Sequence, residues 1–84
     1  MAELDPIRLA KVRALAASGE ARRIRERALL SCADIAGSCG VDQASVWRWE
    51  EGTRRPHGDA AIRYGELLES LDRAASRRDA AAAS

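Results

Sequence analysis

The chain is poor in aromatic side chains, with no Phe and one Tyr among its 84 residues. Its two tryptophans, Trp47 and Trp49, lie two positions apart in the stretch VDQASVWRWEEG, residues 41–52. Residues two apart on a helix point about 200° apart around its axis. We therefore expect one indole to face the core and the other to face outward, where its exposure needs a functional explanation.

Other absences exclude whole classes of protein. No apolar run approaches the length of a membrane span, and no basic lead before an apolar run marks a secretion signal. We therefore expect a cytoplasmic protein that makes no membrane contact. Cys32 and Cys39 on one helix would place their Cα atoms about 10.5 Å apart, beyond the ~7 Å limit of a disulfide. With one His and no CxxC pair, the sequence predicts reduced thiols, no metal and no other cofactor.

Charge is nearly balanced, with 14 basic and 13 acidic residues and a net charge of +1. Any surface that binds nucleic acid must therefore be local. Glu50 has no partner base, nucleophile or ligand cluster, so the sequence predicts no enzyme. The length bounds the chain to one domain near the lower size limit for a self-sufficient core. Helix formers dominate and β-branched residues are few, which favours an all-α fold.

Capping and turn residues divide the chain into a compact bundle of about five short helices. Asp5, Ser31, Asp42 and Asp59 are expected N-caps, whereas glycines end the helices. An alternative interpretation joins the first two helices into one that bends at Ser18-Gly19. The expected helices run over residues 7–17, 20–29, 32–38, 43–51 and 59–71, the last with an extension as far as residue 76.

The most informative unit is residues 31–56, where two short helices flank a tight turn with Gly40 at its bend. In a helix-turn-helix, the helices cross at about 90–120°. That crossing needs a small residue where the helices touch, a glycine in the turn and a branched apolar residue facing back. The buried positions of this template, with Gly40, are filled by Ile35, Ala36, Cys39, Val41, Val46 and Trp49.

The stretch LSCADIAGSCGVDQASVWRWEEGTRRP resembles the Cro/lambda-repressor type of helix-turn-helix, the XRE family. The resemblance runs from about Ala21 to Leu71 and implies a lambda-repressor-like fold. With the resemblance, the chain divides into an N-terminal accessory helix (1–19), a helix-turn-helix DNA-binding domain (20–72) and a tail (73–84). The tail is expected to be frayed or disordered because its end is Ala-rich and lacks large apolar residues. The matching positions are Leu30-Ser31, Ala36, Gly40-Val41, Trp49-Glu50, Gly52 and Arg55-Pro56.

The resemblance also implies roles for individual residues. Trp49 is the buried indole of the recognition helix, about 43–51, and Trp47 lies on the face presented to DNA. Base contacts in the major groove are expected from Gln43, Ala44, Trp47 and Arg48. Phosphate contacts are expected from Ser31, Cys32, Thr53, Arg54 and Arg55.

Several of these positions have a competing structural interpretation. Cys32 stands where the family usually places the Gln that contacts a phosphate. Arg48 would otherwise pair with Glu51 or Asp42 on a solvated helix face. Trp47 would otherwise pack against a neighbouring helix or subunit. The arginines of residues 22–27 are interpreted as a solvated helix face from which Arg22 or Arg23 reaches a phosphate.

The function these features favour is sequence-specific binding of double-stranded DNA at a palindromic operator, as in small Cro-like repressors of temperate phages. No small-molecule ligand is expected. One alternative is an antitoxin that represses its own operon and binds a protein toxin. Another is a protein-interaction module that does not bind DNA, which the acidic residues Asp42, Glu50 and Glu51 near the groove face favour.

A weak or DNA-induced homodimer is also expected, because one recognition helix reads only a few base pairs. In the last helix, Ile62, Gly65 and Leu68 are expected to pack inward. A neighbouring stripe at helical spacing would supply the dimer contacts. The alternative packs that stripe within one chain, on Leu9, Val12 or Leu15. The stripe consists of Tyr64, Leu67 and Leu71.

Overall fold

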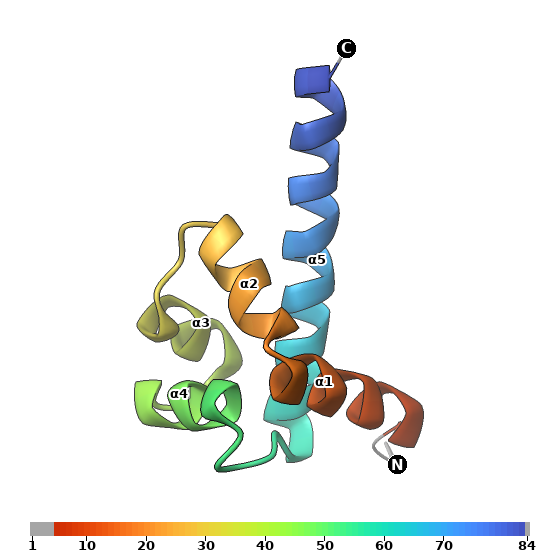
Figure 1. Ribbon diagram of the computed structural model, residues 1–84. Coiled ribbons are helices and arrows are strands. Elements are labelled where there is room, and N and C mark those ends of the chain that lie inside the picture. The colour runs from red at the N-terminus through yellow and green to blue at the C-terminus, as the bar shows by residue number, and fades with distance from the viewer. Residues whose placement is uncertain (1–4, 84) are drawn as a thin grey trace.

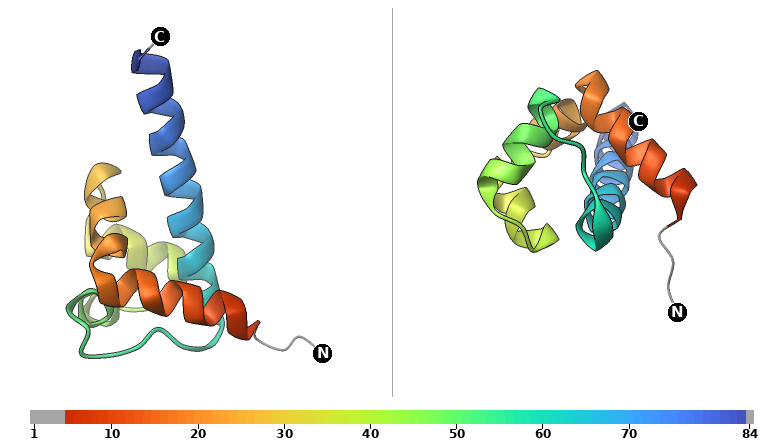
Figure 2. Two further views of the ribbon diagram at one scale, coloured as in Figure 1. Left: turned by 45° about the vertical axis from the view of Figure 1, so that its right-hand side comes forward. Right: turned by 90° about the horizontal axis from the view of Figure 1, so that it is seen from below.

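A computed structural model describes residues 5–83, and these residues contain five α-helices and no strand (Figure 1). The predicted all-α class is confirmed. Helix α5 forms a long column, α1 crosses its lower end, and α2 to α4 stack on one side (Figure 2). The molecule measures 43 × 27 × 22 Å, because α5 projects beyond the other helices. The helices are α1 (Pro6–Ser18), α2 (Glu20–Arg27), α3 (Cys32–Cys39), α4 (Gln43–Glu51) and α5 (Gly58–Ala83).

Side-chain caps fix where α1, α3 and α4 begin. The Asp5 carboxylate accepts the backbone N–H of Ile7 at 2.9 Å at the start of α1. At the start of α3, Ser31 and Asp34 form a reciprocal capping box. Gly19 has φ +87°, so the chain leaves α1 through a left-handed residue and starts α2 as a separate helix. The alternative of one long helix that bends at this point is therefore wrong.

The end of α2 and the start of α5 differ from the sequence prediction for identifiable reasons. Helix α2 ends at Arg27, two residues early, because Leu29 adopts φ +61° and the N–H of Leu30 bonds to the carbonyl oxygen of Arg25 at 3.2 Å. Helix α5 begins at Gly58, and the N–H of Ala61 bonds to the carbonyl oxygen of His57 at 3.2 Å. Asp59 therefore lies inside the first turn of α5, where its charge suits the helix dipole, and is not the N-cap.

The structure also continues α5 to Ala83, through residues for which the sequence predicts a frayed tail. Ala75 is buried, and Asp79 forms an ion pair with Arg27. The Arg78 guanidinium donates to the carbonyl oxygen of Arg27 at 3.3 Å. These contacts join the upper part of α5 to the end of α2. Residues 1–4 of the predicted accessory segment and residue 84 of the predicted tail lie outside the described residues.

The core joins all five helices, and α1 is part of it. Val12 of α1 is 1% exposed, and a Cβ added to Gly65 of α5 would lie 3.3 Å from the Val12 Cβ. The two helices therefore approach closely, as the single-chain alternative for the α5 stripe requires. The fully or nearly buried residues include Val12, Ala16, Ala21, Ile24, Ile35, Ala36, Cys39, Val46, Trp49, Ala61, Tyr64 and Leu68.

The predicted stripe on α5 needs one correction. Tyr64 is 1% exposed and its ring lies 4.8 Å from that of Trp49, centroid to centroid. Its hydroxyl has no hydrogen-bond partner within the described part of the chain. A residue this deep in the monomer core cannot contact a second copy, so the assignment of Tyr64 to a dimer interface is wrong. Leu67 and Leu71 are half-buried and pack against the same core. No helix within residues 5–83 is long and apolar enough to cross a membrane.

Candidate nucleic-acid interface

Helices α3 and α4 are joined by a short turn at Gly40, which has φ +72°. The N–H groups of Gly40 and Val41 both bond to the carbonyl oxygen of Ala36, which closes the end of α3. From α5, the Arg63 Nε donates to the Cys39 carbonyl oxygen at 3.0 Å. Val41 is half-buried against the core formed in part by the other predicted helix-turn-helix positions. Those positions, all buried, are Ile35, Ala36, Cys39, Val46 and Trp49.

Helix α4 has one buried face and one exposed face. Trp49 is 3% exposed, whereas Trp47 is 53% exposed. Trp47 therefore does not pack against a neighbouring helix of this chain, whereas packing against a neighbouring subunit stays a prediction. The exposed face also carries the three other predicted base-contacting side chains, Gln43, Ala44 and Arg48.

An open depression of about 490 Å³ lies at the N-terminal end of α4. Its walls come from both helices of the turn motif, because Cys32 starts α3 and Asp42 caps α4 by accepting the N–H of Ser45 at 2.9 Å. The Ser45 side chain and then its backbone N–H lower the pKa of Asp42. The depression therefore brings one predicted phosphate-contacting residue beside three predicted base-contacting ones. Its lining residues are Cys32, Asp42, Gln43, Ala44 and Trp47.

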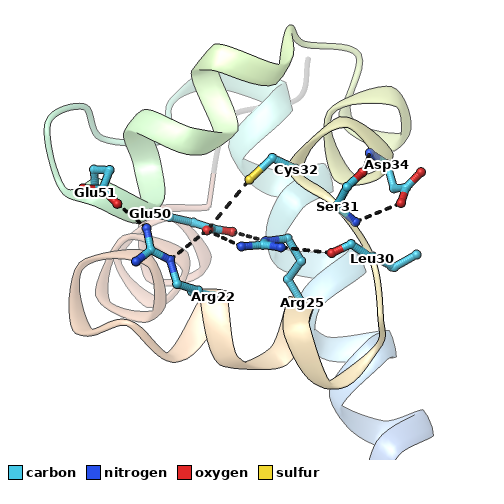
Figure 3. Close-up of polar contacts among 8 residues, drawn as sticks. All are labelled: Arg22, Arg25, Leu30, Ser31, Cys32, Asp34, Glu50 and Glu51. Atoms are coloured by element: carbon cyan, nitrogen blue, oxygen red, sulfur yellow. Dashed lines mark hydrogen bonds and ion pairs between the residues drawn. The ribbon is translucent and has the colours of Figure 1, made fainter.

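A buried carboxylate braces α4 against α2, as Figure 3 shows. The Glu50 side chain is 1% exposed. The Arg25 Nε and Nη2 atoms donate to its two oxygens at 2.6 and 2.9 Å, and the Arg22 Nε donates at 3.1 Å. Arg22 also pairs with Glu51. These four charged side chains hold the recognition helix at a fixed place on the domain.

The brace controls protonation as well as position. Burial raises the pKa of Glu50, but the hydrogen bonds from Arg25 and Arg22 outweigh burial and hold this pKa below its ordinary value. The Cys32 sulfur lies 3.9 Å from a Glu50 oxygen (Figure 3). Burial and the nearby Glu50 carboxylate raise the pKa of the Cys32 thiol. The structure therefore places Cys32 against the brace, and both cysteines are free.

The brace corrects the sequence prediction that the arginines of residues 22–27 form a solvated helix face, because Arg22 and Arg25 bind Glu50. Arg22 and Arg25 are three residues apart and so share one side of α2. Two features of the sequence point to the brace. One is the three-residue spacing of these arginines, and the other is an acidic residue directly after Trp49, which is buried. Arg23 does lie on an exposed face and pairs with Glu20 of its own helix.

Six arginines of the described chain form ion pairs, whereas the three arginines at and just after the C-terminal end of α4 do not. Arg8, Arg22, Arg23, Arg25, Arg27 and Arg73 all pair with carboxylates. Within residues 5–83, Arg48, Arg54 and Arg55 form no ion pair. In this part of the chain neither Glu51 nor Asp42 forms an ion pair with Arg48, and the role of Arg48 stays a prediction. Positive charge gathers at the C-terminal end of α4 although the whole chain carries only +1.

Two further predicted phosphate-contacting residues are exposed at helix ends. The Ser31 hydroxyl accepts the N–H of Asp34 at 3.0 Å as the N-cap of α3. Thr53 follows Gly52, and its N–H bonds to the carbonyl oxygen of Arg48 at 3.0 Å. Across the described residues, no group of three His, Cys, Asp or Glu side chains could hold a metal ion.

Two short helices around a glycine turn, with the second helix braced on one face and exposed on the other, define a helix-turn-helix protein of the DNA-binding class. The chain belongs to a helix-turn-helix domain family, whose model matches residues 16–78. The match covers the end of α1, all of α2 to α4 and most of α5. No curated protein and no solved structure matches the chain. DNA-binding domains of this type are typically not enzymes.

Proposed function

We propose that the protein is a sequence-specific transcriptional regulator of the Cro/lambda-repressor type, which represses transcription by placing α4 in the major groove of its operator. The observation that supports this proposal is the division of α4. One side is fixed by Trp49 and Glu50, and the other side leaves Trp47 and Arg48 exposed. A helix held this firmly presents its exposed side chains in one geometry, as base recognition requires.

The exposed side chains have the chemistry of base readout. Gln43 can form two hydrogen bonds with adenine, and Arg48 can form two with guanine. Ala44 and Trp47 supply apolar contact for a thymine methyl group or a sugar. The phosphate contacts that set the register come from residues at the helix ends and the following loop. They are Ser31, Cys32, Thr53, Arg54 and Arg55.

A dimer on DNA completes the proposal. A two-fold pair of copies reads two half-sites about 34–36 Å apart, so the operator is palindromic. Leu67 and Leu71 remain the proposed contacts, because both are half-buried and so keep some exposed apolar surface on α5.

The structure weakens the argument for an interaction module that does not bind DNA. That alternative depends on acidic residues near the groove face. Asp42 caps α4, whereas Glu50 and Glu51 pair with arginines of α2. The carboxylates are thus neutralised or hydrogen-bonded within the domain, and the free cations Arg54 and Arg55 remain.

Selection of binding sites from random duplexes, followed by titration of point-mutated sites, tests the proposal. We expect a palindrome to be recovered. Gln43→Ala should then cost about 1–3 kcal/mol at one base pair and relax the preference there, whereas Arg55→Ala should weaken binding to all sequences alike. Recovery of no preferred sequence, or a sequence-independent effect of Gln43→Ala, would contradict base reading by α4.

A further inference from the structure

A second pocket, of about 120 Å³, lies at the opposite end of α4 from the depression around Trp47. It is partly open and lies between α1 and the loop after α4, two segments that are far apart in the sequence. Three of its lining residues are arginines and none is acidic. The lining residues are Arg13, Ala16, Ala17, Trp49, Gly52, Arg54, Arg55 and Pro56.

Arg13 enters this pocket from α1 in a fixed position. Its Nε donates to the carbonyl oxygen of Pro56 at 2.9 Å, and Pro56 is fully buried. Within the described residues, the Arg13 Nη atoms have no hydrogen-bond or ion-pair partner. A guanidinium held through its Nε and free at both Nη atoms can offer a two-pronged donor to an anion.

The other cations of α1 have different surroundings. Arg8 pairs with Asp5 and with Glu66 of α5. Lys11 lies in another pocket of about 120 Å³, which is also lined by the acidic residues Glu20, Glu69 and Asp72. Arg13 is thus the cation of α1 that faces the loop of the proposed DNA interface, where Arg54 and Arg55 line the same pocket.

We propose that this pocket binds one phosphate group of the DNA backbone, with Arg13 acting together with Arg54 and Arg55. The inference rests on the proposed function, and it adds a contact from α1 to the interface. Arg13 precedes the range 16–78 that the family model matches, so this contact belongs to a segment outside that match. Helix α1 then has two roles, because it covers α5 with Val12 and extends the footprint on DNA with Arg13.

The test is the salt dependence of binding to a mixed-sequence duplex, measured for the wild type, Arg13→Gln and Lys11→Gln. The two variants remove the same charge from the same helix, so Lys11→Gln controls for net charge. We expect Arg13→Gln to reduce the slope of log K against log salt concentration by about one, and Lys11→Gln to leave it unchanged. Arg13→Lys should restore most of the slope, because it restores the charge.

The slope separates a direct contact from a structural effect. If Arg13 only holds the loop through Pro56, Arg13→Gln will lower affinity equally at every salt concentration, and an unchanged slope would overturn the proposal. Equal slopes for Arg13→Gln and Lys11→Gln would overturn it too, while leaving the wild-type protein as a DNA binder. If the wild type shows no salt-dependent binding, the proposed function itself fails.

A titration with inorganic phosphate at constant ionic strength distinguishes a DNA phosphate from a free one. The probe is the Nε–H signal of Arg13 in an NMR spectrum. We expect this signal to shift with duplex DNA at concentrations at which inorganic phosphate leaves it unchanged. A shift with inorganic phosphate and none with DNA would overturn the assignment to the DNA backbone.

Discussion

Trp47 and Trp49 occupy opposite faces of α4, so substitution of each should have a different effect. Trp49 is 3% exposed and its ring packs on Tyr64. Trp49→Ala should lower the free energy of unfolding by about 3–5 kcal/mol, the range for a large buried aromatic side chain. Trp47→Ala should change it by less than about 0.5 kcal/mol and should weaken DNA binding. Urea denaturation checks the stability of both variants, and equal destabilisation would contradict the assignment of faces.

Glu50 and Glu51 are adjacent acidic residues in very different environments. Glu50→Gln should lower the free energy of unfolding by about 3 kcal/mol, because it leaves the half-buried Arg25 without its carboxylate. Glu51→Gln is the matched control. It removes only a surface pair with Arg22 and should cost less than about 1 kcal/mol. Similar costs for both variants, measured by urea denaturation, would contradict a buried brace.

The wild type and Glu50→Gln should differ in how their stability responds to acid. The pKa of Glu50 is lower in the folded protein than its ordinary value, since two arginines stabilise the carboxylate against the effect of burial. The stabilisation is therefore complete above the unfolded pKa, about 4.3, and is lost as the pH falls through the folded pKa. Wild type should lose more stability than Glu50→Gln between about pH 6 and pH 3. Parallel pH profiles would contradict this linkage.

For single residues, the sequence predicts the orientation of a side chain where the geometry of one helix determines it. The opposite orientation of Trp47 and Trp49 follows from helical geometry alone. The Glu50 brace did not follow, because its arginine partners lie 25 and 28 residues away on another helix. Tyr64 was misplaced because the buried face of α5 is set by packing on α1 and on Trp49. The contacts with DNA remain predictions.

Among the elements, the turn after α2 stores backbone strain. Leu29 has φ +61° and is 87% exposed, so its side chain contributes little packing. A left-handed conformation costs a residue with a Cβ about 1–2 kcal/mol. Glycine avoids this cost, but its greater freedom in the unfolded chain offsets part of the gain in stability. Leu29→Gly should therefore be more stable than Leu29→Ala by about 0.5–1 kcal/mol. Thermal melting of both variants checks this. A less stable glycine variant would contradict the strain.

The sequence predicts where a helix begins if a neighbouring side chain caps it. It does not predict where a helix ends if a contact with a distant segment determines that end. The starts of α3 and α4 follow directly from Ser31 and Asp42, whose side chains bond within their own first turns. The length of α5 did not follow from its Ala-rich end. Its upper part is helical in a structure where Arg78 and Asp79 contact the end of α2.

Across the molecule as described, residues 5–83, the large apolar side chains that remain exposed lie on different elements. Ile7, Leu29 and Trp47 belong to α1, the turn after α2, and α4. Leu67 and Leu71 already pack partly on their own core. We therefore expect the free protein to sediment as a monomer and two copies to sediment together on a palindromic duplex. A strict one-to-one complex on a non-palindromic site would contradict dimer formation on DNA.

The central claim is that the exposed face of α4 binds DNA while its buried face holds the domain together. The two tryptophans report on these faces separately through their indole N–H signals in an NMR titration with duplex DNA at low salt. We predict that the Trp47 signal shifts, that the Trp49 signal stays in place, and that added salt reverses the shift because phosphate contacts are salt-dependent. An unchanged Trp47 signal at saturating DNA would contradict the account.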